Sequence, residues 1–69
     1  MSERVAQIAH DLNNILTEIV VSSDLLLDEL PMNDPGRADV LVSRGAALRG
    51  AELTRQLLEC VGGSDARPL

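Results

Sequence analysis

The chain has 69 residues, 45% of them hydrophobic and none aromatic, and its formal net charge is −5 at pH 7. The 6 basic residues are all arginines, scattered among 11 acids, so the charge disfavours binding to nucleic acid. A single cysteine excludes an internal disulfide, and with one histidine it offers no metal-ligand cluster. Because a chain this short rarely builds an adequate core alone, its apolar surface predicts burial between two subunits.

The sequence contains no segment that reads as a membrane span. Its longest apolar segment, residues 15–27, is shorter than the roughly 20 residues that a span needs, and Glu18 and Asp24 interrupt it. No basic leader precedes an apolar run, as a secretory signal requires. We therefore expect a cytoplasmic chain with no direct insertion into a membrane.

An amphipathic pattern predicts a first helix from about residue 2 to residue 30, with Ser2 as its N-cap. Its large apolar residues form two adjacent rows, and smaller residues widen the stripe on one flank. The rows are Val5, Leu12, Ile19 and Leu26, then Ile8 and Ile15; the flank is Ala9, Leu16, Ser23 and Leu30. Because this stripe is broader than a two-stranded seam, we expect the helix to contact more than one neighbour.

Prolines and a glycine interrupt the pattern, and we expect a turn at residues 31–34. Asp34 is suited to be the N-cap and Pro35 the first residue of a second helix, predicted from about residue 35 to residue 61. Residues 62–69 are expected to form a flexible tail. The inner face predicted for the second helix consists of Ser43, Ala46, Ala47, Gly50, Leu53, Thr54, Leu57 and Cys60.

A connection this short predicts an antiparallel helical hairpin, so the expected fold class is all-α. Two hairpins that each carry an apolar face can bury those faces against each other. We therefore expect residues 1–61 to form one domain that assembles as a homodimer, a four-helix bundle with twofold symmetry.

His10 is the only histidine and is predicted to face solvent on the first helix, away from the apolar rows. Neutral imidazole is a nucleophile near pH 7, and its attack is helped when an acceptor holds the other ring N–H. Asp11 is a candidate for that acceptor, although consecutive helical residues lie about 100° apart. Asn14 lies one turn along the same face, where it could orient water or a phosphoryl group, and Asn13 is expected in solvent. The alternative readings are an incidental surface histidine and a solvated Asn14.

Three stretches together resemble the dimerisation and histidine-phosphotransfer domain of sensor histidine kinases: residues 10–14 (HDLNN), 24–27 (DLLL) and 53–58 (LTRQLL). The likeness covers roughly residues 3–61 and is nearest to the branch with a His-Asp-Phe-Asn-Asn core, which is common among hybrid kinases. It implies that His10 is the phosphoacceptor, that Asp11 assists the kinase step, and that Asn14 serves a phosphatase activity. The chain departs from the family pattern at Leu12, Ile15, Ser43, Gly45 and Cys60.

The resemblance also implies partners: an ATP-binding kinase domain, with ATP and Mg²⁺, and a response-regulator receiver domain whose aspartate accepts the phosphoryl group. The chain has no glycine-rich phosphate loop, so we expect the phosphoacceptor part of a histidine protein kinase rather than a complete enzyme. The receiver is expected to contact Thr17, Val20, Val21, Asp24 and Gln56. The chain is then either a piece of a larger kinase or is served by a kinase domain in trans.

Two alternative functions use the same fold. One is a structural helical-hairpin dimerisation module without phosphotransfer, in which His10 has no role. The other is a stand-alone phosphorelay intermediate, which shares the chemistry of His10 but never meets ATP.

Overall fold

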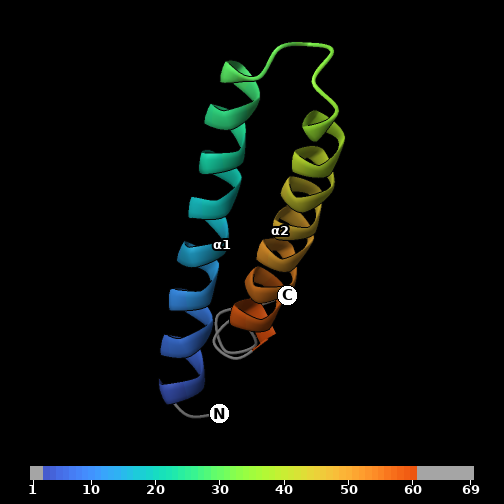
Figure 1. Cartoon of the computed structure of the whole chain (residues 1–69). Coiled ribbons are helices and arrows are strands. Elements are labelled where there is room, and N and C mark those ends of the chain that lie inside the picture. Colours follow the sequence, from blue (N-terminus) through green and yellow to red (C-terminus); the bar gives the residue numbers. More distant parts are fainter. Residues whose placement is uncertain (1–2, 61–69) are drawn as a thin grey trace.

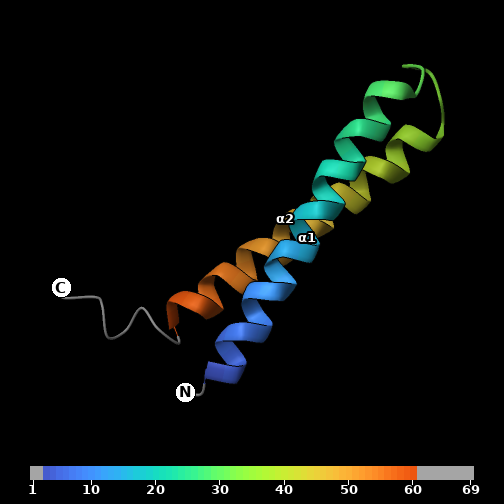
Figure 2. The same ribbon diagram turned by 90° about the vertical axis from the view of Figure 1, so that its left-hand side faces the viewer.

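The computed structural model describes residues 3–60, which form two helices joined by a short turn (Figure 1). Helix α1 spans Glu3–Glu29 and helix α2 spans Gly36–Leu58. The helices lie side by side and antiparallel (Figure 1), and they cross each other when the hairpin is seen from the side (Figure 2). The predicted all-α hairpin is confirmed for these residues, whereas the Ser2 cap and the tail at 62–69 lie outside the described residues.

The start of α2 is held by the residue predicted to cap it. The Asp34 carboxylate accepts a hydrogen bond from the backbone N–H of Gly36 at 2.7 Å, which satisfies a donor that the helix leaves unpaired. Pro35 already has helical dihedral angles, with φ −65° and ψ −21°. A Cβ atom on Gly36 would lie 3.0 Å from the same Asp34 oxygen, so the glycine gives the capping carboxylate its room.

The end of α1 is capped from the other side of the turn. The Arg37 guanidinium donates hydrogen bonds to the backbone carbonyls of Leu27, at 2.8 Å, and Leu30, at 3.2 Å. A cation at the last carbonyls of a helix satisfies free acceptors and offsets the negative end of the helix dipole. Arg37 therefore ties the two helices together at the turn, a role that the sequence did not indicate.

The seam between the two helices consists mainly of small, polar and medium-sized residues. The half-buried and buried positions repeat every three or four residues on each helix, as antiparallel packing requires. A Cβ atom on Gly50 would lie 3.1 Å from Leu16 Cδ1, so the helices approach closely there. The seam residues are Ala9, Asn13, Leu16, Val20, Ser23 and Leu27 of α1 and Val40, Arg44, Ala47, Ala51, Thr54 and Leu58 of α2.

This seam corrects the faces expected on both helices. On α2, five residues of the predicted inner face are exposed: Ser43, Ala46, Leu53, Leu57 and Cys60. The flank predicted only to widen the stripe of α1 is the part that packs on α2, whereas most of the two rows of large residues stay exposed. Ile8, Leu12, Ile15, Ile19 and Leu26 keep between 42% and 60% of their surface exposed in the single hairpin. A heptad pattern identifies an apolar stripe but does not say which part of it faces the nearest helix.

We call this exposed surface the apolar face: Ile8, Leu12, Ile15, Ile19 and Leu26 of α1 with Leu53 and Leu57 of α2. A shallow groove between the helices runs along it, with Ile15, Ile19 and Leu26 on one wall and Val40 and Ser43 on the other. Contiguous exposed apolar surface of this kind marks an interaction site. Neither α1 nor α2 is long and apolar enough to cross a membrane.

Candidate functional site

His10 lies on the side of α1 opposite the apolar face. It is two residues from Ile8 and two from Leu12, and two helical steps of about 100° carry a side chain to the far side of the helix. The imidazole is exposed, and no group within residues 3–60 makes a hydrogen bond or ion pair with it. The ring nitrogens are thus open to a molecule that approaches from solvent.

Asp11 and Asn14 flank His10 on the exposed surface of α1. The Asp11 carboxylate accepts a hydrogen bond from Gln7 Nε2 at 3.2 Å, one turn earlier, rather than from His10. Asn14 is exposed and lies one turn beyond His10 on the same face. The structure therefore places one carboxylate and one amide next to His10 without joining the three side chains by hydrogen bonds.

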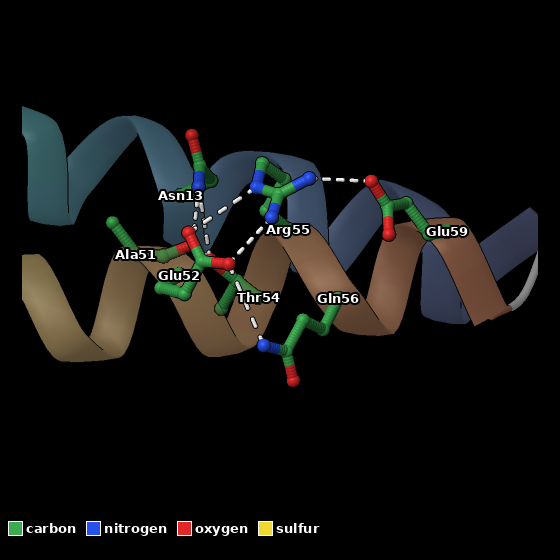
Figure 3. A network of polar contacts seen from close by, with 7 residues as sticks. All are labelled: Asn13, Ala51, Glu52, Thr54, Arg55, Gln56 and Glu59. Carbon is green, nitrogen blue, oxygen red and sulfur yellow. Dashed lines mark hydrogen bonds and ion pairs between the residues drawn. The ribbon is translucent and has the colours of Figure 1, made fainter.

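Asn13 was expected in solvent, and that expectation is wrong. Its side chain is half-buried in the seam, where Nδ2 donates to the Ala51 carbonyl and to Thr54 Oγ1, both at 3.0 Å (Figure 3). Thr54 is only 6% exposed, and its hydroxyl donates to the same Ala51 carbonyl at 2.9 Å. The interaction needs Thr54 and Ala51 opposite, so the pattern of α1 alone could not reveal it.

The residues predicted to contact a receiver differ in their placement. Thr17, Val21 and Asp24 are exposed. The Asp24 carboxylate accepts from Arg44 Nε at 2.5 Å, which links the two helices on the same side of the hairpin as His10. Val20 is half-buried, which corrects its expected place on the surface that a receiver contacts: it lies seven residues past Asn13 and so falls in the seam.

A charged cluster on α2 lies at the level of His10, because Thr54 opposes Asn13 in the antiparallel pair (Figure 3). Arg55 bridges the carboxylates of Glu52 and Glu59. Its hydrogen bond lowers the pKa of the Glu52 carboxyl below the ordinary 4.5, and the two carboxylates raise the pKa of Arg55. Gln56, the fifth predicted receiver contact, donates to Glu52 at 3.4 Å and points away from α1 (Figure 3).

Within residues 3–60, no group of three or more His, Cys, Asp or Glu side chains is arranged to hold a metal ion. Cys60 is an exposed free thiol. The chemistry that this surface offers is that of one accessible nucleophile, His10, with a carboxylate and an amide within a turn of it.

Comparison with known proteins finds a similar stretch within a sensor kinase. The chain is 46% identical over 61 residues to "Sensor kinase CckA" of Brucella abortus (strain 2308), a match that covers 88% of this chain. The chain spans about 6% of the length of that relative. No family model matches the sequence, and no solved structure matches it. The similarity supports a region of a sensor kinase.

Proposed function

We propose that this chain is the phosphoacceptor and dimerisation region of a sensor histidine kinase, of the type with a His-Asp-x-Asn-Asn core. The observation that carries the proposal is the imidazole of His10, exposed and free of polar contacts within the described residues, on the side of α1 opposite the apolar face. The 46% identity to a sensor kinase supports the assignment to this class of enzyme.

In the kinase step, a ring nitrogen of neutral His10 attacks the γ-phosphorus of ATP, which a separate kinase domain holds with Mg²⁺. The N–P bond forms as the bond between the γ-phosphorus and the bridging oxygen breaks, and ADP leaves with that electron pair. The proton on the other ring nitrogen passes to a base, and Asp11 is the nearest carboxylate in sequence. Asp11 must exchange its hydrogen bond from Gln7 for one from His10 to take this role.

In the transfer step, the phosphoryl group moves from His10 to an aspartate of a response-regulator receiver domain. A carboxylate oxygen attacks phosphorus, the N–P bond breaks, and the imidazole recovers the electron pair and a proton. The receiver would contact the exposed residues of α1 just beyond His10, namely Thr17, Val21 and Asp24. Gln56 would contact the receiver at the rim of this surface, from the outer side of α2. We place both reactions in the cytoplasm.

Asn14 would give the same surface an opposing activity, removal of phosphate from the receiver. Its exposed amide, one turn beyond His10, would orient a water molecule toward the aspartyl phosphate of a docked receiver. Attack by that water on phosphorus breaks the acyl phosphate bond and releases inorganic phosphate. The chain would then act as a phosphatase toward its own product.

Dimerisation would bury the apolar face. Two hairpins related by a twofold axis can pack these faces into a four-helix bundle, with the same patch used on both copies. Because His10 lies on the opposite side of α1, burial of Ile8, Leu12 and Ile15 leaves its imidazole accessible. In such a dimer the surface that assembles would be separate from the surface that reacts.

The test is phosphorylation of the whole chain by a sensor-kinase ATP-binding domain supplied in trans with radiolabelled ATP and Mg²⁺. We expect label that is labile to acid and stable to base, absent from His10→Gln and retained by Asp28→Asn. Asp28 is an exposed residue five turns along the same face of α1, so it controls for a general change of that surface. Equal labelling of His10→Gln and the unmodified chain would overturn the proposal.

The exposed apolar face also favours a second candidate, a structural dimerisation module without phosphotransfer. That reading predicts that substitutions of His10, Asp11 and Asn14 leave every activity of the parent protein unchanged. A stand-alone phosphorelay intermediate, the third reading, takes label from a phosphorylated receiver but not from ATP and a kinase domain.

A further inference from the structure

We propose that Asn13 is a positioning residue of the phosphotransfer site, an inference that rests on the proposed function. Its amide joins α1 to α2 within one turn of His10 and thereby sets the direction in which His10 and Asn14 face. Asn13 itself touches neither substrate nor phosphoryl group and acts through its neighbours on the helix.

The contact is a closed arrangement of three groups in the seam. Asn13 Nδ2 donates to the Ala51 carbonyl and to Thr54 Oγ1, at 3.0 Å each, and Thr54 Oγ1 donates to the same carbonyl at 2.9 Å. Thr54 is 6% exposed, so its hydroxyl is shielded from competing water, and the two hydrogen bonds from Asn13 are part-buried. Figure 3 shows the Asn13 side chain reaching from α1 to these two groups of α2.

Apolar contacts alone would define the position of α1 less sharply here. The neighbouring seam residues Ala9, Ala47 and Gly50 are small. Leu16 packs closely on Gly50, but an apolar contact has no preferred direction. A hydrogen bond has one: a slide of about 1.5 Å along the axis, the rise of one residue, would stretch a 3.0 Å contact across the helices to about 3.4 Å and tilt it. Asn13 therefore fixes both the register and the rotation of α1 at this level.

Two other side-chain links join the helices within the part of the chain that the structure describes. They are the exposed ion pair of Asp24 with Arg44 and the cap that Arg37 forms on α1 at the turn. Both lie three or more turns along α1 from His10. Near the reacting surface, Asn13 supplies side-chain hydrogen bonds that orient α1 on α2.

The placement of Asn13 relative to His10 makes this orientation matter. His10 lies three residues earlier, which is about 60° around a helix, so its ring projects beside the edge of the seam. Asn14 follows Asn13 directly and is turned about 100° away from α2. A rotation of α1 would carry both side chains away from positions that a docked kinase or receiver domain addresses, and misplacement by about 1 Å can slow a reaction by about a hundredfold.

The chain allows the positioning role to be separated from stability. Asn13→Leu removes the amide but fills similar space, and Thr54 keeps its hydrogen bond to the Ala51 carbonyl, so no buried hydroxyl is left without a partner. Thermal unfolding should therefore show a variant at least as stable as the unmodified chain. Its kcat for phosphorylation by the kinase domain should fall about tenfold or more, while KM for that domain changes less than twofold.

Substitutions at Thr54 supply the matched pair. Thr54→Val removes the hydroxyl at nearly constant shape, whereas Thr54→Ser keeps it. We expect Thr54→Val to have a lower kcat than the unmodified chain and Thr54→Ser to have the same kcat as the unmodified chain. If Asn13→Leu fails to fold, the comparison of these two Thr54 variants decides the matter.

The outcomes distinguish this inference from the proposed function. Equal kcat for folded Asn13→Leu and the unmodified chain, or for Thr54→Val and Thr54→Ser when only these fold, overturns the positioning role. Absence of label on His10 in the unmodified chain overturns the proposed function instead. If kcat of Asn13→Leu falls only because a lower melting temperature leaves part of the chain unfolded in the assay, Asn13 is assigned to stability. That outcome likewise overturns the positioning role.

Discussion

Helix α1 has two unlike sides that flank the same seam. On one side, Ile8, Leu12, Ile15, Ile19 and Leu26 form the apolar face; on the other, His10, Asn14, Thr17 and Asp24 form a polar surface with Val21 among them. In a single hairpin the two sides are similarly exposed. The exposed fraction of a side chain in one hairpin therefore does not tell a surface suited to assembly from a surface suited to chemistry. The residue types on each side do.

Substitution by aspartate should separate the two sides most strongly. Ile19 is 42% exposed and Val21 is 52% exposed, so one hairpin predicts similar tolerance for Ile19→Asp and Val21→Asp. If the apolar face is buried between two copies, Ile19→Asp places a charge where desolvation costs several kcal/mol, on the order of what a small domain can lose. We expect Ile19→Asp to be monomeric or unfolded and Val21→Asp to remain a dimer.

Sedimentation of the two variants, with circular dichroism of each, measures this difference. Leu12→Asp should repeat the result of Ile19→Asp at a second position on the apolar face. Native dimers for both Leu12→Asp and Ile19→Asp would show that this face is not the interface. The two sides of α1 would then not differ in their role in assembly.

The polar side should respond in rate rather than in assembly. Asp11→Asn keeps the hydrogen bond from Gln7 within reach but removes the base, so we expect a dimer that takes label onto His10 about a hundredfold more slowly. Asn14→Ala should leave labelling near its normal rate and reduce dephosphorylation of the receiver. Single-turnover labelling and receiver dephosphorylation, measured on the same preparations, compare the two. An unchanged labelling rate for Asp11→Asn would remove Asp11 from the mechanism.

Arg37 lies at the start of α2, outside both sides of α1, and its substitution shows how large a purely structural effect should be. Arg37 caps α1 through the carbonyls of Leu27 and Leu30, and Arg37→Ala should lower the free energy of unfolding by about 1–2 kcal/mol. Arg49→Ala, at an exposed position of α2, should change it by less than about 0.5 kcal/mol. Urea unfolding measures both. Labelling of His10 should be unaffected in either variant under conditions where it is folded.

The sequence predicted those features that depend on local pattern. The two helices, the cap at Asp34 and the exposure of His10 follow from periodicity and turn chemistry within a few residues. The parts it missed depend on pairing. A polar residue such as Asn13 is assigned to solvent by default, and only the opposing Thr54 and Ala51 make its burial favourable.

Val20 and Arg37 were missed for the same reason. Val20 was assigned to the receiver contact rather than to the apolar stripe, and whether it faces α2 depends on which flank of α1 the hairpin closes on. Arg37 caps a helix that ends seven or more residues earlier, across a turn whose path no local rule gives. The roles proposed for His10, Asp11 and Asn14 rest on chemistry and family resemblance, and the structure adds that all three residues are exposed.

The smallest expected effect concerns Glu52, on α2 at the level of the site. The hydrogen bond from Arg55 lowers the pKa of its carboxyl in the folded chain below the ordinary 4.5. The stabilisation from this pair is therefore present above about pH 4.5 and is lost as the pH falls through the lowered pKa of the folded state. Helicity of Glu52→Gln should thus depend less on pH in the acid range than that of the unmodified chain, whereas Glu18→Gln, an equal change of charge at an exposed position of α1, should follow the unmodified chain. Identical acid transitions for the two variants would show that Arg55 does not hold Glu52 in solution, and the charged cluster beside the site would then have no fixed geometry.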